Sequence, residues 1–311
     1  MSDVVLVTGA GGFAGSYLVE HLLASPKRPK REGGSTSQTV VAWTRHTVDL
    51  LDRNRVRAAI GELRPTQVYH CAGKTHVAQS WRDSAQPLED NVLATEFLFG
   101  ALRDAGVRCR VLIPGSATVY APSADPIVES HTIAPANPYA ISKLAQEQLA
   151  LRAVEEDGLD VIVTRSFNHT GPRQTPAFVA PSMARQIALI ERGQLEPVIK
   201  VGNLEARRDV TDVRDVVRAY VALMQSGATG VIYNVASGVA RSIQSILDAL
   251  VSRSHVPVRI EVDPARLRPN DVSVIAGDYS RLTAATGWRP EIPFDKMMDD
   301  LLSYWRSEAR I

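Results

Sequence analysis

Two kinds of segment alternate along the first half of the chain. Short runs rich in β-branched residues are separated by longer stretches in which apolar residues recur with helical spacing. The short runs predict strands at 4–8, 39–44, 67–72, 108–114 and 160–165. The longer stretches predict helices near 13–25, 52–63, 86–105 and 137–157. Strands and helices that alternate in this way predict an α/β fold, in which a doubly wound parallel sheet is covered by helices.

The pattern continues in the second half of the chain. Apolar residues between Val213 and Met224 have helical spacing, with Thr211 or Asp212 as the N-cap and Gly227 as the terminating residue. One more apolar run follows and predicts a further strand. The parallel sheet is therefore expected to continue after an excursion of the chain.

This organisation predicts two domains. An NAD(P)-binding Rossmann domain would comprise residues 1–165 and about 208–238. A smaller C-terminal α/β domain, comprising about 166–207 and 239–311, would bind the substrate. The segment 25–37 is polar, basic and rich in glycine and serine, which predicts a surface loop.

Composition and charge narrow the class of protein. Hydrophobic residues make up 45% and charged residues 22% of the 311 residues, as in ordinary globular proteins. The net charge of +1 gives no general attraction to polyanions, which argues against nucleic acid as a partner. Neither a leader peptide nor a membrane span is expected, since no apolar stretch approaches ~18 residues. Cys71 and Cys109 lie in segments that resemble strands, so no disulfide or metal site is expected and a reducing cytoplasm is the predicted compartment.

A glycine-rich turn follows the first predicted strand and opens the first predicted helix. It carries Gly9, Gly12, Phe13 and Gly15. Gly9 would allow a tight turn, Gly12 would let the backbone approach a pyrophosphate, and Gly15 would let the helix pack on the strand. The free N–H groups of the helix N-terminus would then face the anion. We expect a dinucleotide cofactor at this turn.

The second predicted strand ends at Thr44-Arg45, where an acidic residue would hold the ribose hydroxyls of NAD. An arginine can instead form forked hydrogen bonds with a 2′-phosphate. Asp49 is a candidate acceptor for the adenine amino group, and Leu50 and Ala72 are expected beside the cofactor. The pattern favours NADP(H) as the cofactor, with NAD(H) as the alternative.

A candidate proton donor lies on the helix predicted after the fourth strand. Tyr139 and Lys143 are four residues apart, which puts them on one face of the helix. A nearby ammonium favours the ionised form of a phenol, so Lys143 is expected to make Tyr139 a stronger acid while bonding the nicotinamide ribose. Ser116 ends the fourth strand, where its hydroxyl could bond a substrate oxygen. The spacing of Tyr139 and Lys143 alone also fits an ordinary pair on a helix surface.

Five segments together resemble the extended short-chain dehydrogenases, whose members act on nucleotide-linked sugars as epimerases, dehydratases and reductases. They are TGAGGFAG at 8–15, HCAGKTHV at 70–77, GSATVY at 115–120, NPYAISK at 137–143 and RDVTDVRD at 208–215. The resemblance covers essentially the whole chain. It implies that Ser116, Tyr139 and Lys143, which also contacts the cofactor, form the catalytic group. It also implies a homodimer through a four-helix bundle of helices near 88–105 and 137–156.

The residues after Ser116 separate the branches of this family. Its 4,6-dehydratases typically place a glutamate where this chain has Thr118, and that glutamate acts as acid and base to expel water. Threonine cannot do so at neutral pH. The branch with a cysteine at this position, which makes GDP-fucose, is disfavoured too. Ketone reduction and 4-epimerisation with tightly bound NAD remain, and an intact catalytic group argues against a non-catalytic cofactor-binding regulator.

Segments 165–174, 196–215, 233–238 and 267–271 resemble the GDP-4-keto-6-deoxy-D-mannose reductases. The resemblance implies reduction of the C4 ketone of the GDP-linked deoxysugar to GDP-D-rhamnose with NAD(P)H. It implies substrate contacts from Thr75, Asn168, Arg185, Asn203, Arg208 and Arg268. His169 is a further candidate, as a base. Nothing in the spacing distinguishes guanine from another base.

Overall fold

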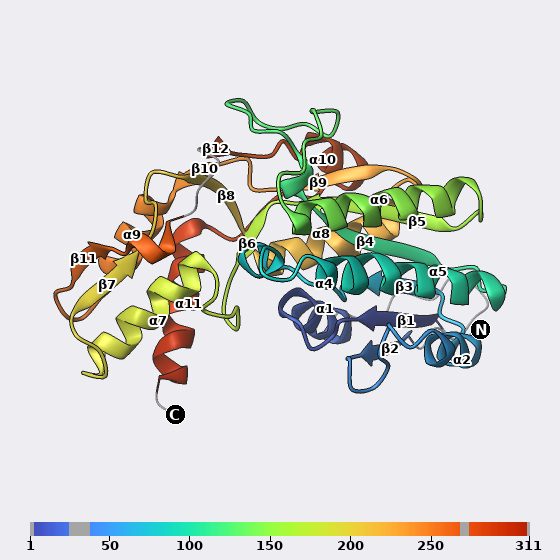
Figure 1. The fold of residues 1–311 in the computed structure, drawn as a ribbon, viewed down its shortest axis with the longest axis horizontal. Coiled ribbons are helices and arrows are strands. Elements are labelled where there is room, and N and C mark those ends of the chain that lie inside the picture. The colour runs from blue at the N-terminus through green and yellow to red at the C-terminus, as the bar shows by residue number, and fades with distance from the viewer. Residues whose placement is uncertain (1–2, 25–37, 268–273, 310–311) are drawn as a thin grey trace.

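The computed structural model describes residues 3–24, 38–267 and 274–309, and the predicted loop at 25–37 lies outside them (Figure 1). The first part of the chain forms β1 (Asp3–Thr8), α1 (Phe13–Ala24), β2 (Gln38–Trp43), α2 (Arg53–Leu63), β3 (Gln67–His70), α3 (Val77–Ser80), α4 (Ala85–Pro87), the π-helix η1 (Leu88–Leu93), α5 (Ala94–Asp104), β4 (Arg110–Ser116), the 3₁₀ helix η2 (Ala117–Val119), α6 (Pro138–Glu155) and β5 (Asp160–Ser166). The second part forms β6 (Asn168–Thr170), α7 (Val179–Glu191), β7 (Val198–Val201), β8 (Arg207–Asp212), α8 (Val213–Ser226), β9 (Ile232–Val235), β10 (Ala240–Ser242), α9 (Ile243–Val251), β11 (Arg259–Val262), the 3₁₀ helix η3 (Pro264–Arg266), β12 (Val274–Ile275), α10 (Ser280–Thr286) and α11 (Phe294–Glu308).

The central sheet has six parallel strands in the order β2-β1-β3-β4-β5-β9. The predicted doubly wound parallel fold is thus confirmed. The chain runs outward from β1 to β2 and then crosses to β3 on the other side of β1. In open α/β sheets, ligands bind beyond the carboxyl ends of the strands at such a reversal. The turn after β1 lies at this point.

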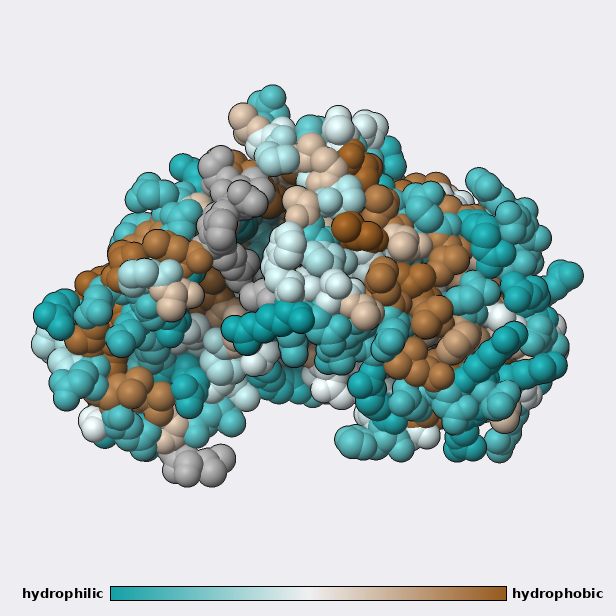
Figure 2. Space-filling model, viewed as in Figure 1, coloured by the Kyte–Doolittle hydropathy of each residue, from teal (hydrophilic) through white to brown (hydrophobic). Residues whose placement is uncertain are grey.

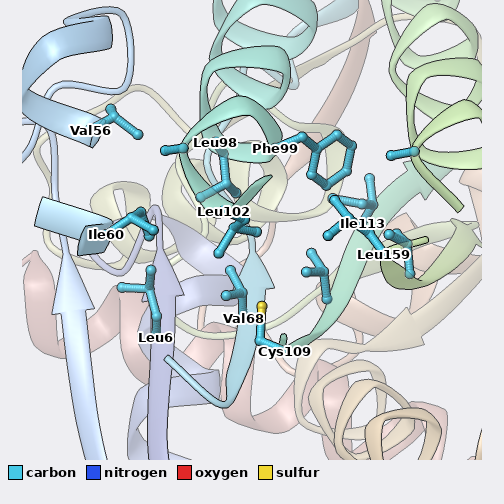
Figure 3. Packing of buried hydrophobic residues seen from close by; sticks show 14 of the residues in the cluster. Leu6, Val56, Ile60, Val68, Leu98, Phe99, Leu102, Cys109, Ile113 and Leu159 are labelled. Atoms are coloured by element: carbon cyan, nitrogen blue, oxygen red, sulfur yellow. The ribbon is translucent and has the colours of Figure 1, made fainter. Parts of the chain in front are cut away.

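Helices cover both faces of the sheet. On one face, Leu98 and Leu102 of α5 pack with Leu6 of β1 in a buried cluster to which α2 and α6 also contribute (Figure 3). On the other face, Val5 of β1 lies in a cluster with Tyr220 of α8, together with residues of α1 and α10. Adjacent residues of β1 therefore pack in the cores on opposite faces of the sheet, as expected for a strand buried on both sides.

The second part of the chain builds a smaller lobe beside the sheet, seen at the left of Figure 1. It contains a sheet of β10, β8 and β12, with β6 paired to β8, and a two-stranded sheet of β7 and β11. A separate core joins Met183 and Ile187 of α7, Leu247 of α9, and Leu301 and Leu302 of α11. The predicted smaller α/β unit is present.

The predicted helices agree with the structure except at one internal feature. The stretch expected as one helix near 86–105 consists of α4, η1 and α5 in succession. A π-helical segment widens the turn, and such segments are frequent at functional sites. Asp90 and Asn91, which are adjacent in η1, are both buried. Within the described residues, no helix combines the length and the apolar character that crossing a membrane requires.

One strand lies later in the chain than predicted. β4 pairs with β3 from Gln67 opposite Arg110, and it runs on to Ser116, whereas the sequence indicated 108–114. Cys109 therefore precedes β4, and Cys71 follows the end of β3. The prediction that both cysteines lie inside strands was wrong because apolar character continues beyond the paired part of each strand. Both are free thiols.

Candidate active site

The glycine-rich turn is packed too closely for side chains at two positions. Gly9 has a φ of +66°, and a Cβ atom on it would lie 2.5 Å from the backbone nitrogen of Ala72. A Cβ atom on Gly15 would lie 2.2 Å from the carbonyl oxygen of Gly9. The turn therefore brings β1, the segment after β3 and the N-terminus of α1 together. This leaves the first N–H groups of α1 beside a backbone cradle that fits a pyrophosphate.

A cavity of about 210 Å³ opens beside this turn. The predicted cofactor residues Gly9, Arg45, Asp49, Leu50 and Ala72 all line it. Gly12, Phe13 and Gly15 do not line this cavity, and they form the turn and the start of α1 instead. The walls and the cradle fit a dinucleotide, with the diphosphate at the turn and the adenosine toward the end of β2.

Arg45 meets an acidic partner that the sequence did not reveal. Its guanidinium donates to Oδ1 of Asp90, which comes from the π-helical segment η1 and also lines the cavity. The Arg45 side chain is 57% exposed and that of Asp90 only 7%. The Arg45 guanidinium is thus largely exposed at the wall of the cofactor cavity, and the buried carboxylate of Asp90 holds it there.

The three predicted catalytic residues are buried together at the carboxyl edge of the sheet. Asn137 caps α6 by accepting from the backbone N–H of Ala140 at 2.9 Å, with a proline as the first helical residue. This cap places Tyr139 in the first turn of α6 and Lys143 one turn later. Ser116 ends β4 and lies beside Tyr139, close enough to affect its pKa.

Burial controls the protonation of these groups. It raises the pKa of Tyr139, and the nearby hydroxyl of Ser116 opposes this only in part. Burial also lowers the pKa of Lys143 to about 8. The pKa of Tyr139 is thus raised by burial and not lowered as expected from Lys143, whose ammonium donates to Pro114 and Gln146 at 2.7 and 2.8 Å. Tyr139 is therefore protonated at neutral pH, as a proton donor must be.

Ser116 has a second hydroxyl partner in Thr118. Their Oγ and Oγ1 atoms are 2.9 Å apart, and Ser116 also accepts from the backbone N–H of Thr118. The position at which the resemblance places a glutamate in dehydratases is thus filled by a neutral hydroxyl next to the predicted catalytic serine. This group can orient Ser116, but it cannot act as an acid and base at neutral pH.

A larger cleft of about 510 Å³ lies between the sheet and the smaller lobe, lined by residues of β6, α7, β7 and β8. Three predicted substrate residues line it, namely Asn168, Asn203 and Arg208. Thr75 and Arg185 are exposed and do not line it, and Arg268 lies outside the described residues. Substrate contacts from Thr75 and Arg185 therefore stay predictions.

The structure adds residues that the sequence reasoning missed. Lys200 and Arg266 bring two further cations to the cleft, while His76 and Phe178 meet with ring centroids 5.2 Å apart. Both ring nitrogens of His76 lack a hydrogen-bond partner among the described residues. His76 is the neighbour of Thr75 in an already recognised motif, but no signal in the sequence indicated which of the two lines the cleft.

One ring contact joins the phosphate turn to the substrate cleft. Phe13, at the start of α1, stacks on His169 with ring centroids 5.9 Å apart. His169 lines the cleft, and burial lowers its pKa, so the ring is neutral. A neutral, stacked imidazole with Nδ1 3.2 Å from the carbonyl oxygen of Phe167 fits a structural part of the wall better than a base.

The parallel sheet, the glycine cradle and the Ser116, Tyr139 and Lys143 group together define an extended short-chain dehydrogenase. A family model described as GDP-mannose 4,6 dehydratase matches residues 6–301, so the chain belongs to this family. It is 37% identical to the GDP-6-deoxy-D-mannose reductase of Pseudomonas aeruginosa, over all of this chain and 99% of that protein.

Solved structures give the same placement. The structure of RMD from Pseudomonas aeruginosa complexed with NADPH matches with a TM-score of 0.89 and 35% identity, covering 98% of this chain and 99% of that one. The UDP-glucose 4-epimerase of Thermus thermophilus in complex with NAD matches with a TM-score of 0.82 and 28% identity, covering 97% and 99%. The predicted fold and the predicted family are both confirmed.

Proposed function

We propose that this protein is an NADPH-dependent reductase that converts GDP-4-keto-6-deoxy-D-mannose to GDP-D-rhamnose, also named GDP-6-deoxy-D-mannose. The observation that carries the proposal is Arg45 on the wall of the cofactor cavity, because its guanidinium complements the 2′-phosphate that distinguishes NADPH from NADH. The full-length similarity to a GDP-6-deoxy-D-mannose reductase, and the fold match to a relative complexed with NADPH, support the same reaction and cofactor.

The catalytic residues divide the chemistry between them. Bound NADPH supplies a hydride for the C4 carbon of the ketone. Tyr139 donates a proton to the oxygen, and Ser116 hydrogen-bonds that oxygen as negative charge develops on it. Lys143 would donate to the nicotinamide ribose when the cofactor is bound.

The cleft suits a nucleotide diphosphate sugar. Lys200, Arg208 and Arg266 bring positive charge to one cleft, and a diphosphate in a protein of almost zero net charge needs such local cations. The cleft is also lined by neutral polar groups such as Asn168 and His169, which suit the hydroxyls of a hexose. We propose that the diphosphate and base lie at the cationic end.

A second candidate is a 4-epimerase with tightly bound NAD. The fold match to a UDP-glucose 4-epimerase in complex with NAD favours it. An epimerase returns its hydride to the sugar and can keep one NAD molecule, whereas a reductase must exchange its cofactor after each turnover. The absence of a carboxylate at Thr44-Arg45 favours the reductase.

The function is tested by following NADPH absorbance with a panel of 4-keto-6-deoxyhexoses linked to GDP, UDP and dTDP. We expect rapid oxidation with the GDP-linked mannose derivative alone, and a product with the D-rhamno configuration by NMR. Rapid turnover of a UDP-linked or dTDP-linked sugar would overturn the assignment of the base. Conversion without NADPH consumption would establish the epimerase.

We also propose a homodimer through the helices η1, α5 and α6. Leu88 and Leu93 of η1 are 43% and 45% exposed, and Ile141 of α6 is 50% exposed. Apolar side chains gather over this part of the surface in Figure 2. Two copies of the helix pair would form a four-helix bundle that covers them. Light scattering should give a dimer mass, and Leu93→Glu with Ile141→Glu should give a monomer; a wild-type monomer would contradict the proposal.

We further propose that residues 1–165 and about 208–238 form the cofactor domain, with the remaining residues forming the substrate domain. The separate apolar core around α7, α9 and α11 supports this division. A cytoplasmic location is proposed as well, since both cysteines are free thiols, which suits a reducing compartment.

A further inference from the structure

A buried chain of polar side chains starts at Lys143 and ends at the phosphate turn. Lys143 Nζ donates to Gln146 Oε1 at 2.8 Å, and Gln146 Nε2 donates to Thr95 Oγ1 at 2.7 Å. His70 lies between Thr95 and Thr8, with Nε2 3.0 Å from Thr95 Oγ1 and Nδ1 2.9 Å from Thr8 Oγ1. All five side chains are buried, and Thr8 directly precedes Gly9.

The direction of every hydrogen bond in this chain is fixed. Thr95 has one hydroxyl proton, and it is donated to the carbonyl oxygen of Asn91 at 2.6 Å. Thr95 Oγ1 must therefore accept from both Gln146 and His70. His70 then carries its proton on Nε2, and Thr8 donates to the bare Nδ1.

This order fixes the amide of Gln146. If the amide were reversed, its NH₂ group would face the ammonium of Lys143 and its oxygen would face a Thr95 hydroxyl whose proton is already used. Both contacts would be lost in a site that excludes water, and each unpaired polar group there is costly. The amide oxygen is thus held toward Lys143 by residues from α5 and β3.

We propose that Gln146 is a positioning residue that fixes the ammonium of Lys143. Lys143 has three N–H donors, and the second bond, to the Pro114 carbonyl at 2.7 Å, ties it to β4. Gln146 and Pro114 together direct two donors, and the third is left for the cofactor ribose. The inference rests on the proposed function only for what Lys143 does there.

Among the titratable groups of the described residues that face Lys143, none supplies a negative charge near pH 7. His70 and Cys71 face it from the end of β3, and Tyr139 shares its helix face. Burial lowers the pKa of His70 to about 3 and raises the pKa of the Cys71 thiol to about 12, so both are neutral near pH 7. The oxygens of Gln146 and Pro114 are therefore the acceptors that offset the burial of the ammonium.

The direct test is a titration of Lys143 in the protein without cofactor, by NMR of lysine labelled with ¹³C at Cε. The chain has six lysines, at 27, 30, 74, 143, 200 and 296, so the resonance can be assigned with Lys143→Met. Gln146→Leu removes one acceptor and should lower the pKa of Lys143 by roughly 1 unit, and Gln146→Glu should raise it. The alkaline limb of kcat should move in the same directions.

Thr95→Val removes the hydroxyl that accepts from the Gln146 amide. It should lower the pKa of Lys143 by less than Gln146→Leu does. Thr283→Val is its matched control, because Thr283 also loses a hydrogen bond, to the carbonyl oxygen of Trp288 at 2.9 Å, but on α10. The control should leave the titration unchanged. If the folded Gln146→Glu and Thr95→Val proteins both titrate Lys143 as the wild type does, the inference is overturned, whatever substrate the enzyme reduces.

Discussion

Arg45 and Asp90 both line the cofactor cavity and form an ion pair with each other. Arg45 follows the end of β2 and Asp90 lies in the π-helical segment η1, 45 residues later in the chain. Only one carboxylate oxygen of Asp90 has a partner among the described residues. Arg45 offers a cation that a 2′-phosphate can reach, and its positive charge offsets the negative charge of Asp90. Removing either residue should therefore change the cofactor preference.

Arg45→Ala should weaken NADPH binding by about 1 to 3 kcal/mol, the range for losing a charged hydrogen bond, and leave NADH binding nearly unchanged. In Arg45→Ala the carboxylate of Asp90 loses its partner and would repel a 2′-phosphate, so Arg45→Ala with Asp90→Ala should bind NADPH more tightly than Arg45→Ala alone. Fluorescence titration measures both cofactors. Arg53→Ala, on the exposed start of α2 outside this cavity, is the control and should bind NADPH normally. Unchanged NADPH affinity in Arg45→Ala would remove Arg45 from the site.

Tyr139→Phe should lower kcat by at least ~100-fold, because only the proton donor is lost. Cofactor affinity should stay within about twofold of the wild-type value, since the ring still fills its buried position. Stopped-flow measurement of NADPH oxidation, together with a separate cofactor titration, distinguishes the two effects. Near-normal turnover would exclude Tyr139 as the donor.

The wild-type protein should not dehydrate GDP-mannose. Thr118 offers only a hydroxyl that is bonded to Ser116, and no carboxylate stands at this position to take up and return a proton. Mass spectrometry of the nucleotide sugar after incubation with oxidised cofactor should show unchanged GDP-mannose. Detection of the 4-keto product formed by water loss would overturn the assignment to the reductase branch.

Much of this site could be predicted because its signals are local. The turn from Gly9 to Gly15 needs residues without side chains at fixed positions, and the helix that carries Tyr139 and Lys143 begins at a recognisable cap, Asn137. These requirements lie within a few consecutive residues. Their order along the chain was enough to predict the sheet and the cofactor cradle.

Features that depend on tertiary packing could not be predicted. Asp90 meets Arg45 from the π-helical segment η1, where periodicity alone indicated an ordinary helix. Arg185 lies on the exposed side of α7, while Met183 and Ile187 face the core, and this depends on how α7 packs in the smaller lobe. Lys200, which lines the cleft, lies on β7, and β7 pairs with β11 from much later in the chain.

Acid should destabilise the protein through His70. Burial lowers the pKa of His70 from its ordinary value of 6.5 to about 3, so below pH 6.5 the unfolded chain binds a proton that the folded protein does not. The stability from neutral His70 is complete above pH 6.5 and is lost progressively as the pH falls toward 3. Urea unfolding across this range should show a shallower pH dependence for His70→Gln, while exposed His46→Gln should follow the wild type. An unchanged slope in His70→Gln would contradict the account.

The central claim is that the protein consumes NADPH to reduce a GDP-linked ketone, and the most direct measurement follows the cofactor itself. Purified protein is first denatured and the supernatant assayed for NAD, and native protein is then mixed with NADPH and GDP-4-keto-6-deoxy-D-mannose. The account predicts little released NAD and one NADPH oxidised for each sugar reduced. Release of one NAD per chain, with sugar converted and no NADPH oxidised, would contradict it.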